Sequence, residues 1–487
     1  MFMKDSFQKK LLLAGTLFLV AVTIIFLQGL SNVNVSEGKN EEKISLSASY
    51  IVTNGQALVK VQAVSEHGLK ELRYQKGNVT STANSKWKSA EKITGKQFSA
   101  RKKGTYSIRA VDEAGNKKVC KLSVALELKA VWIYFDEFYK KAASYSKWKS
   151  FINSTYTTCK NNHINAVFLQ VRPFADAMYP SDYYPWSRYA TGTPGKDPGF
   201  DPLAYAVKAA HENGIAIHAW INPYRITVAS MKKSMIPKGS IARKWIDAKS
   251  RNVIKYAGAY YFNPSKQAVR DLVANGVREM VENYDLDGIH MDDYFYPTLG
   301  TANFKKFDYK EYKKSDTDLS LVAWRRENVN KMVRQLYKTV KSIDKTCLFG
   351  ISPAGNLSNL YSNYAYYSDV KKWMGTTGYV DYICPQLYWS FKQKVAPYKK
   401  FLGNWVSIKR HESVDMYIGL GAYRAGISKA EAKKIYDMEW SQSNTVLKRQ
   451  VLYARKTKQV DGFVLFSYSS LKSKKAKKEI KNLKSVF

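Results

Sequence analysis

Residues 287–297 read DGIHMDDYFYP, an apolar strand pattern that ends in two adjacent acids and a cluster of aromatic residues. Residues 289–291 have the character of a buried strand, and Asp292 and Asp293 follow directly. An unpaired carboxylate is costly to bury, so a core strand rarely ends in this way. In a barrel of parallel strands, the C-terminal strand ends carry the catalytic groups. The stretch therefore predicts a barrel strand that brings acids to a site; the alternative is that both acids cap a helix or pair with Arg and Lys.

Seven further apolar, β-rich runs resemble this one and are separated by helix-like segments such as 202–212, 266–283 and 322–343. The eight runs are AVWIYFDEF (130–138), INAVFLQVRP (164–173), IAIHAWINPY (215–224), DGIHMDDYFY (287–296), CLFGISPAG (347–355), VDYICPQLYW (380–389), MYIGLGAY (416–423) and GFVLFSYSS (462–470). Apolar strands that alternate with helices indicate a parallel sheet covered by helices. Residues 128–487 are therefore predicted to form an α/β fold, a (β/α)8 TIM barrel. A doubly wound open sheet is the alternative, but no Gly-rich phosphate loop follows the first run.

Residues 44–126 have a different pattern, in which short alternating runs are separated by turns. ALVKVQAV (57–64) and TYSIRAVD (105–112) alternate with a period of two, which is typical of antiparallel strands. The segment GTYSIRAVDEAGNKKVCKLSV (104–124) resembles the last hairpin of bacterial immunoglobulin-like wall modules. We expect a small all-β immunoglobulin-like sandwich that serves as a spacer or a binding module.

The N-terminus carries a basic flank and a long apolar segment. Lys4, Lys9 and Lys10 precede residues 11–30, which contain no charged residue and are long enough to cross a bilayer as one helix. This pattern predicts export, with residues 1–30 acting as a signal peptide or an uncleaved transmembrane signal anchor. No clear cleavage site follows, which favours the anchor, and residues 31–43 are expected to be a linker. The protein is expected on the extracellular face of the cytoplasmic membrane, or secreted to the cell wall of a bacterium.

The 487 residues carry a formal net charge of +38, from 78 Lys and Arg against 40 Asp and Glu. Such a field attracts polyanions. No nucleic-acid-binding motif is present, so we expect no nucleic-acid partner but an anionic cell-wall polymer or membrane surface. The tail 471–487, with seven Lys and one Glu, is one candidate surface. The four cysteines lack metal-binding spacing, and we expect no cofactor and no resident metal.

Polar and aromatic residues end the apolar runs at positions where a core strand would be apolar. Carboxylates and amides suit sugar hydroxyls, Arg suits acidic substituents, and aromatic faces suit the sugar ring. The residues that we expect to bind substrate are Arg172, Asp176, His218, Trp220, Asn222, Tyr224, Arg225, His290, Tyr294, Gln386, Tyr388 and Trp389.

Five segments together resemble one protein family. They are FLQVRPFADAMYPSDYYPWS (168–187), HAWINPYR (218–225), YFNPSKQAVRDLV (261–273), DLDGIHMDDYFYP (285–297) and YICPQLYW (382–389). In these segments the chain resembles the glycosyl-hydrolase-like family 10 proteins, bacterial exported barrels related to glycoside hydrolases. The resemblance covers about residues 128–470. It implies hydrolysis of glycosidic bonds in a cell-wall glycan, with peptidoglycan strands as the expected substrate.

Glycosidases generally use two carboxyl groups, and the resemblance leaves the identity of this pair open. Side chains alternate along a strand, so Asp292 is expected to share the inward face with His290 and to act as nucleophile or base. Asp293 would then orient a loop or the substrate. The partner acid is Glu137, which we place with Asp292 and Asp293 in the catalytic set, or else Asp136 or Asp176.

Two other functions remain open. His218, His290 and Asp292 could together hold Zn²⁺ for metal-dependent deacetylation of wall sugars. The chain could also be a glycan-binding wall protein without catalytic activity.

Overall fold

The computed structural model describes residues 43–53, 55–292 and 295–487, and residues 44–487 form one compact unit. The expected signal or anchor segment, nearly all of the expected linker, and the site residues Asp293 and Tyr294 lie outside the described residues. Among the residues that the structure describes, no helix is both long and apolar enough to cross a membrane.

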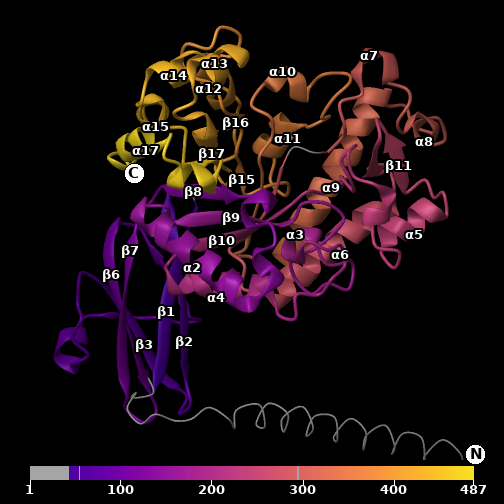
Figure 1. Ribbon diagram of the computed structural model, residues 1–487. Coiled ribbons are helices and arrows are strands. Elements are labelled where there is room, and N and C mark those ends of the chain that lie inside the picture. The colour runs from indigo at the N-terminus through magenta and orange to yellow at the C-terminus, as the bar shows by residue number, and fades with distance from the viewer. Residues whose placement is uncertain (1–42, 54, 293–294) are drawn as a thin grey trace, which may run out of the picture. The chain divides into compact units, whose positions relative to one another are not determined.

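Parallel strands close into a barrel (Figure 1). Within the described residues the barrel sheet has nine strand segments, and two of them, β15 and β16, occupy one position in series. Pairing of β15 with β17 and of β18 with β8 closes the sheet, so eight strand positions result and the predicted (β/α)8 barrel is confirmed. The segments are β8 (Leu128–Ile133), β9 (Ala166–Arg172), β10 (Ala216–Ile221), β13 (Gly288–Met291), β14 (Leu348–Ile351), β15 (Tyr382–Ile383), β16 (Gln386–Leu387), β17 (Asp415–Leu420) and β18 (Gly462–Leu465).

Helices lie between successive strands in the chain and cover the outside of the barrel. The longer ones are α2 (Tyr145–Asn161), α4 (Pro202–Glu212), α6 (Gln267–Asn283), α9 (Leu321–Ile343), α12 (Tyr398–Val406), α15 (Val446–Lys456) and α17 (Lys477–Lys484). Shorter ones are α3 (Arg188–Thr191), α5 (Ile241–Asp247), α7 (Gly300–Asn303), α8 (Tyr309–Lys313), α10 (Leu357–Leu360), α11 (Val370–Gly375), α13 (Lys429–Lys434), α14 (Glu439–Gln442) and α16 (Tyr468–Lys472). The connection from β10 to α6 also contains a hairpin of β11 (Val253–Tyr256) and β12 (Ala259–Phe262).

The strands end earlier than the apolar runs that predicted them. The first run, 130–138, becomes a strand only to Ile133, and residues Phe135–Phe138 form the 3-10 helix η2. A capping box between Tyr134 and Glu137 stabilises this turn. Asp136 and Glu137, the acids at the end of this run, therefore lie on a turn at the rim and not within the sheet.

Two glycines make room for large side chains inside the barrel. A Cβ atom at Gly288 would lie 2.4 Å from Nδ1 of His218, and one at Gly350 would lie 2.2 Å from the ring of Tyr382. Both glycines lie in strands, where only the smallest residue permits such a close approach. They allow His218, His290 and Tyr382 to pack against one another within the barrel.

Residues 44–124 form two antiparallel sheets. One has the order β1-β2-β5 and the other β4-β3-β6-β7, and a single core contains residues of both, so the predicted all-β sandwich is present. The immunoglobulin-like assignment stays a prediction. The strands are β1 (Ile44–Thr53), β2 (Gln56–Ser65), β3 (Leu69–Lys76), β4 (Glu91–Lys92), β5 (Gln97–Ala100), β6 (Gly104–Asp112) and β7 (Lys117–Val124).

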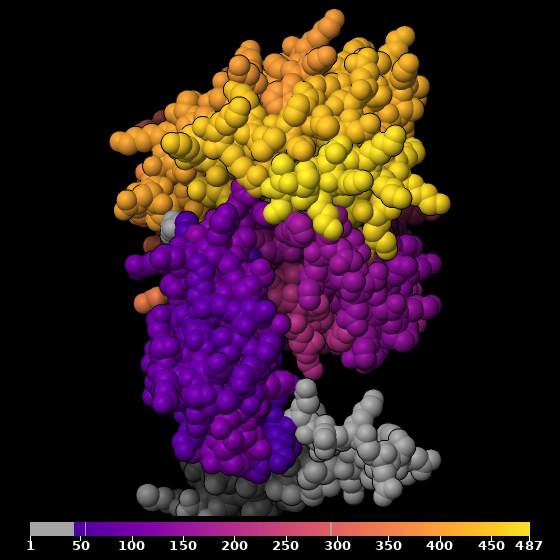
Figure 2. Space-filling model, turned by 90° about the vertical axis from the view of Figure 1, so that its left-hand side faces the viewer, coloured from indigo at the N-terminus to yellow at the C-terminus, as the bar shows by residue number. Residues whose placement is uncertain are grey.

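The sandwich packs against the barrel at the N-terminal ends of the barrel strands. Ile51 of β1 is 1% exposed and belongs to the same apolar cluster as Leu128 and Ala216 inside the barrel. The Tyr417 hydroxyl donates to the carbonyl of Val52 over 3.0 Å. Figure 2 shows the indigo and violet surface of the sandwich meeting the surface of the barrel. The sandwich therefore covers one end of the barrel and leaves the C-terminal face to the loops.

A buried carboxylate joins the two parts electrostatically. Asp287, which directly precedes β13, is 0% exposed and accepts hydrogen bonds from Ile217 N (2.8 Å) and from the His211 ring (2.9 Å). Lys60 of β2 brings its Nζ atom to 3.9 Å from Asp287 Oδ1 and to 3.1 Å from Asp285. Burial alone would raise the pKa of Asp287, but His211 and Lys60 outweigh it and lower the pKa to about 2.

We predict that Ile51→Ala lowers the free energy of unfolding by about 2–4 kcal/mol, because it leaves a cavity in a core shared by the sandwich and the barrel. Val64→Ala, in the same sandwich but 68% exposed, should change it by less than about 0.5 kcal/mol. Urea denaturation followed by tryptophan fluorescence measures both. Equal effects of the two substitutions would mean that Ile51 does not anchor the sandwich.

We predict that Asp287→Asn destabilises the fold by about 3 kcal/mol at neutral pH, because the Lys60 ammonium loses a buried partner. The Asp287 pKa is lowered on folding, so its contribution is complete above the ordinary value of 3.8 and is lost as pH falls toward 2. The difference between wild type and variant should shrink over that interval. Asp285→Asn removes a carboxylate that is 45% exposed and should cost less than about 1 kcal/mol.

Candidate active site

A cavity of about 600 Å³ opens at the C-terminal ends of the barrel strands. This is the face on which barrel enzymes carry their active sites. Eight of its seventeen described lining residues are aromatic, and two carboxylates, Asp136 and Asp292, line it. The lining residues are Trp132, Tyr134, Phe135, Asp136, Gln170, Phe174, Arg188, Tyr189, Trp220, Arg225, Val228, Ser230, Asp292, Ser352, Gln386, Tyr388 and Phe466.

Asp292 follows β13 directly and is 2% exposed. Trp220 of the neighbouring strand β10 donates its indole N–H to Asp292 Oδ2 over 3.3 Å. The β10–β13 register pairs Trp220 with His290, so the indole is one residue pair below the carboxylate and reaches up to it. This hydrogen bond orients Asp292 and is compatible with its charged form.

A chain of hydrogen bonds lies beneath Asp292. The indole N–H of Trp132 donates to Nε2 of His290 (3.1 Å), so Nδ1 of His290 carries the proton and faces the Tyr382 hydroxyl (3.0 Å). That hydroxyl also lies 3.0 Å from Nδ1 of His218. Burial lowers the pKa of His218 to about 4 and that of His290 well below its usual value, so both rings are neutral.

These contacts count against a zinc site formed by His218, His290 and Asp292, because they engage ring nitrogens of both histidines. Nδ1 of each histidine is engaged by Tyr382, and His290 also contacts Ser352 through Nε2 over 3.1 Å. Over residues 43–53, 55–292 and 295–487, no group of three His, Cys, Asp or Glu side chains is placed to hold a metal ion. The arrangement instead resembles a polar support under the floor of the cavity.

Asp136 lies in the 3-10 turn after β8, at the exposed mouth of the cavity. The turn is fixed from the neighbouring strand, because Phe135 N donates to Oε1 of Gln170 over 3.3 Å. Partial burial raises the pKa of Asp136, and the Arg188 guanidinium opposes this rise. A carboxyl group with a raised pKa at the mouth of a cavity is suited to donate a proton.

Glu137, the next residue, does not line this cavity. Its Oε1 accepts hydrogen bonds from the Ser467 hydroxyl and from Ser469 N, both 2.6 Å, and Oε2 accepts from Tyr134 N over 3.2 Å. Burial raises its pKa, and the bonds from Ser467 and Ser469 oppose the rise. Glu137 thus joins the end of β8 to the start of α16, which is a structural role.

Asp176, the third candidate for the partner acid, also lies outside the cavity lining. It accepts a hydrogen bond from Phe174 N over 3.1 Å, within its own loop. Burial raises the pKa of Asp176 to about 6, against the opposing hydrogen bond from Ser187. Among the three candidates, only Asp136 shares a cavity with Asp292.

The other predicted binding residues divide into two groups. Four line the cavity: Trp220, Arg225, Gln386 and Tyr388. The others within the described residues are Arg172, His218, Asn222, Tyr224, His290 and Trp389, none of which belongs to the cavity lining. Arg172 illustrates why: it is 1% exposed, donates to the carbonyl of Asn222 (2.7 Å) and stacks over the ring of Tyr184. Arg172 thus supports the loop after β10 from behind the cavity lining.

Sequence patterns did not single out several aromatic residues of the cavity. Phe466 stacks against Tyr134 and Tyr388, with ring centroids 5.5 and 5.9 Å apart, and Trp132 packs at 6.0 Å from it. Phe466 and Trp132 read as core residues of apolar runs. The only sequence feature that could have marked them as cavity residues is a position near the C-terminal end of a barrel strand. Many core residues have the same position.

Comparison with known proteins identifies relatives. Residues 127–481 match the model of the family described as Glycosyl hydrolase-like 10. Glycosyl hydrolase YngK of Bacillus subtilis is 35% identical over 364 residues, which cover 71% of this chain and 69% of that protein. Glycosyl hydrolase DigH of Escherichia coli is 31% identical over 341 residues, 66% of this chain and 76% of that protein.

A solved structure of the PgaB glycoside hydrolase domain from Bordetella bronchiseptica aligns with a TM-score of 0.46 and 11% identity, over 73% of this chain and 99% of that one. The match to the family model, which spans most of the chain, carries the assignment. The chain belongs to the Glycosyl hydrolase-like 10 family.

Proposed function

We propose that this protein is an exported glycoside hydrolase that cleaves glycosidic bonds in a cell-wall glycan, with peptidoglycan strands as the substrate. The observation that carries the proposal is the pair Asp136 and Asp292, which line one aromatic cavity at the catalytic end of the barrel. Family membership and the printed names of the relatives support glycan hydrolysis. The basic flank and apolar segment at the N-terminus support export to the wall.

In this proposal, Asp292 is the nucleophile or base, and Asp136 is the proton donor. The transition state of glycoside hydrolysis carries positive charge on the sugar ring, which a fixed carboxylate stabilises more than it does the neutral substrate. The Trp220 indole N–H holds Asp292 in place, and the rings of His218 and His290 beneath it are neutral. Asp136 lies at the mouth, where a leaving-group oxygen can accept its proton.

The cavity walls support a carbohydrate ligand. Tyr134, Tyr388 and Phe466 line the cavity, and aromatic rings there suit the apolar face of a sugar. Arg188 and Arg225 also line the cavity and can pair with carboxylate substituents such as those on wall glycans. Within the same proposal, residues 44–126 are an immunoglobulin-like module that holds the N-terminal end of the barrel.

We predict that Asp292→Asn lowers the rate of glycan cleavage by at least ~10² to 10⁴ while glycan binding survives, because the amide keeps the shape but not the charge. Mass spectrometry of products from purified glycan strands, with and without stem peptides, measures cleavage. A pull-down on the same glycan measures binding. Near-normal turnover in this variant would exclude Asp292 as the nucleophile or base.

We predict that Asp136→Asn also lowers the rate by about 10² or more, because it removes the proton donor. Glu137→Gln and Asp176→Asn are the matched controls, and each should lower the rate by less than about tenfold after correction for the folded fraction. Glu137→Gln should reduce stability, since it weakens the link to Ser467. Loss of turnover in Asp176→Asn with normal turnover in Asp136→Asn would reverse the assignment of the acid.

The same product analysis separates hydrolysis from the other candidate reactions. Glycosidic cleavage shortens the glycan, whereas deacetylation removes acetyl groups at constant chain length. Addition of a chelator should leave cleavage unchanged in our proposal, because both carboxylates act without a metal ion. Retained binding with no product from any wall glycan would identify a non-catalytic binding protein.

A further inference from the structure

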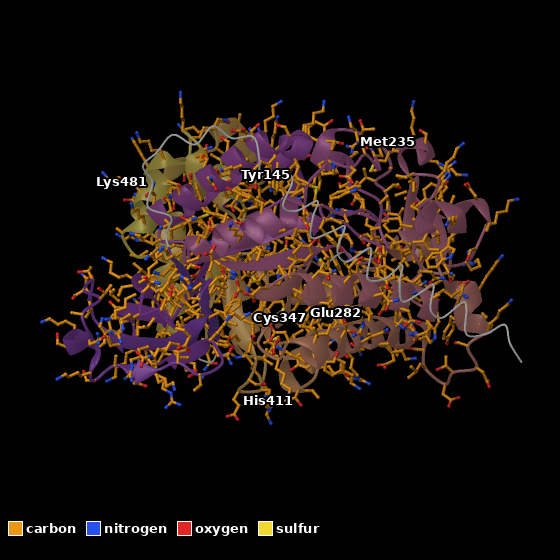
Figure 3. The ribbon with its side chains drawn as sticks, turned by 90° about the horizontal axis from the view of Figure 1, so that it is seen from below. Tyr145, Met235, Glu282, Cys347, His411 and Lys481 are labelled. Carbon is orange, nitrogen blue, oxygen red and sulfur yellow. The ribbon has the colours of Figure 1, made fainter. Side chains whose placement is uncertain are left out.

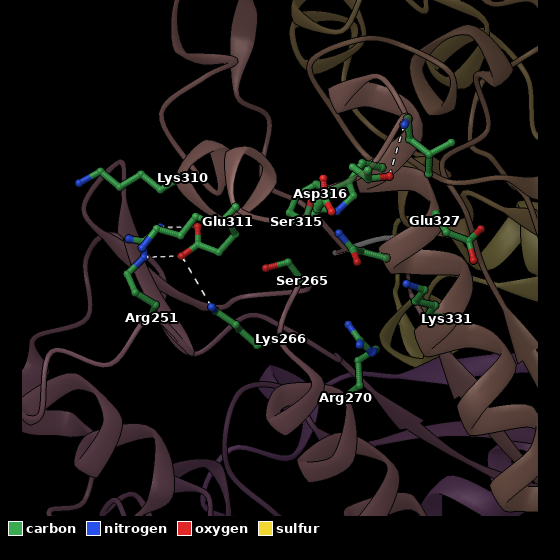
Figure 4. A pocket seen from close by; sticks show the side chains of 15 residues that line it. Arg251, Ser265, Lys266, Arg270, Lys310, Glu311, Ser315, Asp316, Glu327 and Lys331 are labelled. Atoms are coloured by element: carbon green, nitrogen blue, oxygen red, sulfur yellow. Dashed lines mark hydrogen bonds and ion pairs between the residues drawn. The ribbon is translucent and has the colours of Figure 1, made fainter.

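Two basic hollows adjoin on the outside of the barrel, beside helices α6 and α9. The upper hollow, of about 560 Å³, lies where the β10–α6 connection meets α8 and α9, and Figure 4 shows it. The lower one, of about 470 Å³, runs along α6 and α9. Arg270 and Lys331 line both hollows, so the two form one continuous depression, which we name the α6–α9 groove.

The groove concentrates positive charge. Its upper part is lined by six cationic and three acidic residues, and its lower part by five cationic residues and no acid. Lys331, Arg334 and Lys338 are three and four residues apart on α9, which places them on one face of the helix. Basic side chains project from much of the protein surface (Figure 3), so the net charge alone does not locate a binding site. The clustering of cations along one groove does locate one.

Ion pairs within the groove neutralise some of its cationic side chains and leave others available to bind an anion. Glu311 is shared by Arg251 (2.7 Å) and Lys266 (3.9 Å), as the dashed lines in Figure 4 show. Lys331 and Lys338 are exposed, and neither forms an ion pair with an acid among the described residues. Arg270 is fixed by bonds from its guanidinium to the carbonyl of Pro264 (3.0 Å) and to Gln267 (2.7 Å). A rigid guanidinium loses little entropy when it binds an anion.

A buried amide in the upper hollow provides a second, independent observation. Asn328 is 4% exposed and lines the hollow, yet its Nδ2 atom has no hydrogen-bond partner among the described residues. A buried donor without an acceptor costs about 1–3 kcal/mol. An oxygen of a ligand seated beside Arg270 and Lys331 would supply the acceptor.

The shape and composition of the groove favour one class of ligand. A membrane is planar and would contact protruding cations, whereas Arg270 and Asn328 are recessed. Single-stranded nucleic acid binds on aromatic platforms, but the described lining contains one aromatic residue, the largely buried Trp324. A flexible chain with repeated phosphate groups and no aromatic parts fits a groove in which exposed lysines flank the recessed Arg270 and Asn328.

We propose that the α6–α9 groove binds a phosphodiester polymer of the anionic cell-wall type, separately from the glycan cavity. The connection between β10 and α6 supplies Arg225 to the cavity and Arg251 and Lys266 to the groove. A wall polymer held in the groove would therefore keep the barrel rim close to the wall in which the glycan lies.

The test uses the full-length chain and synthetic poly(glycerol phosphate), with binding measured by isothermal titration calorimetry at several salt concentrations. The double variant Lys331→Glu/Lys338→Glu should weaken binding by at least about tenfold at low salt and reduce its salt dependence. The matched control is Lys477→Glu/Lys478→Glu in α17, which makes the same charge change on exposed lysines of the basic tail. It should weaken binding by less than about twofold.

An unchanged thermal midpoint for both double variants shows that the fold is intact, and both positions in each pair are exposed. Equal weakening in the two variants would show that only net charge matters and would overturn the proposal. Groove-dependent binding that is stronger to phosphatidylglycerol vesicles or to oligothymidylate than to poly(glycerol phosphate) would overturn the choice of ligand. These measurements involve no hydrolysis, so their outcome is independent of the proposed catalytic pair.

Discussion

The buried carboxylate of Asp287 is the constraint on which the arrangement of the site depends. It accepts from Ile217 N of β10 and from His211 of α4, and Lys60 of the sandwich balances its charge. Because β13 has only four residues, fixing the carboxylate at its start also fixes Asp292 at its end. The same contacts align β10 with β13, and this alignment brings Trp220 within hydrogen-bond distance of Asp292. Contacts at the N-terminal end of β13 thus fix the position of Asp292 at its C-terminal end.

The architecture could be predicted from the sequence because it depends on local patterns. Eight apolar runs separated by amphipathic segments predict a closed barrel, and alternating runs in 44–126 predict an all-β domain. The strand ends were less predictable, because an apolar run does not show where the chain leaves the sheet. Residues 130–138 have the composition of a strand throughout, yet the chain turns into a 3-10 helix at Phe135. That turn separates Asp136, which lines the cavity, from Glu137, which does not.

The roles of individual polar residues depend on partners distant in the chain, and no local pattern reveals these. Glu137 is removed from the cavity by Ser467, 330 residues further on, and Asp287 is buried as a charge because Lys60 approaches from another domain. His218, His290 and Asp292 are residue types that could hold Zn²⁺ together, but Tyr382 engages both histidine rings. The residue types at the rim were therefore predictable, whereas the choice between a binding role and a supporting role required the three-dimensional contacts.

The electrostatics of the two ends of the barrel differ for a physical reason. At the N-terminal end, Asp287 is surrounded by Lys60 and His211, so its pKa is lowered and it stays charged as a structural ion. At the C-terminal end, the Trp220 indole N–H orients Asp292, and the histidine rings beneath it are neutral. Asp287 at the covered end is thus held as a structural ion by Lys60 and His211, whereas Asp292 at the open end lines the cavity and, in the proposed mechanism, interacts with the substrate.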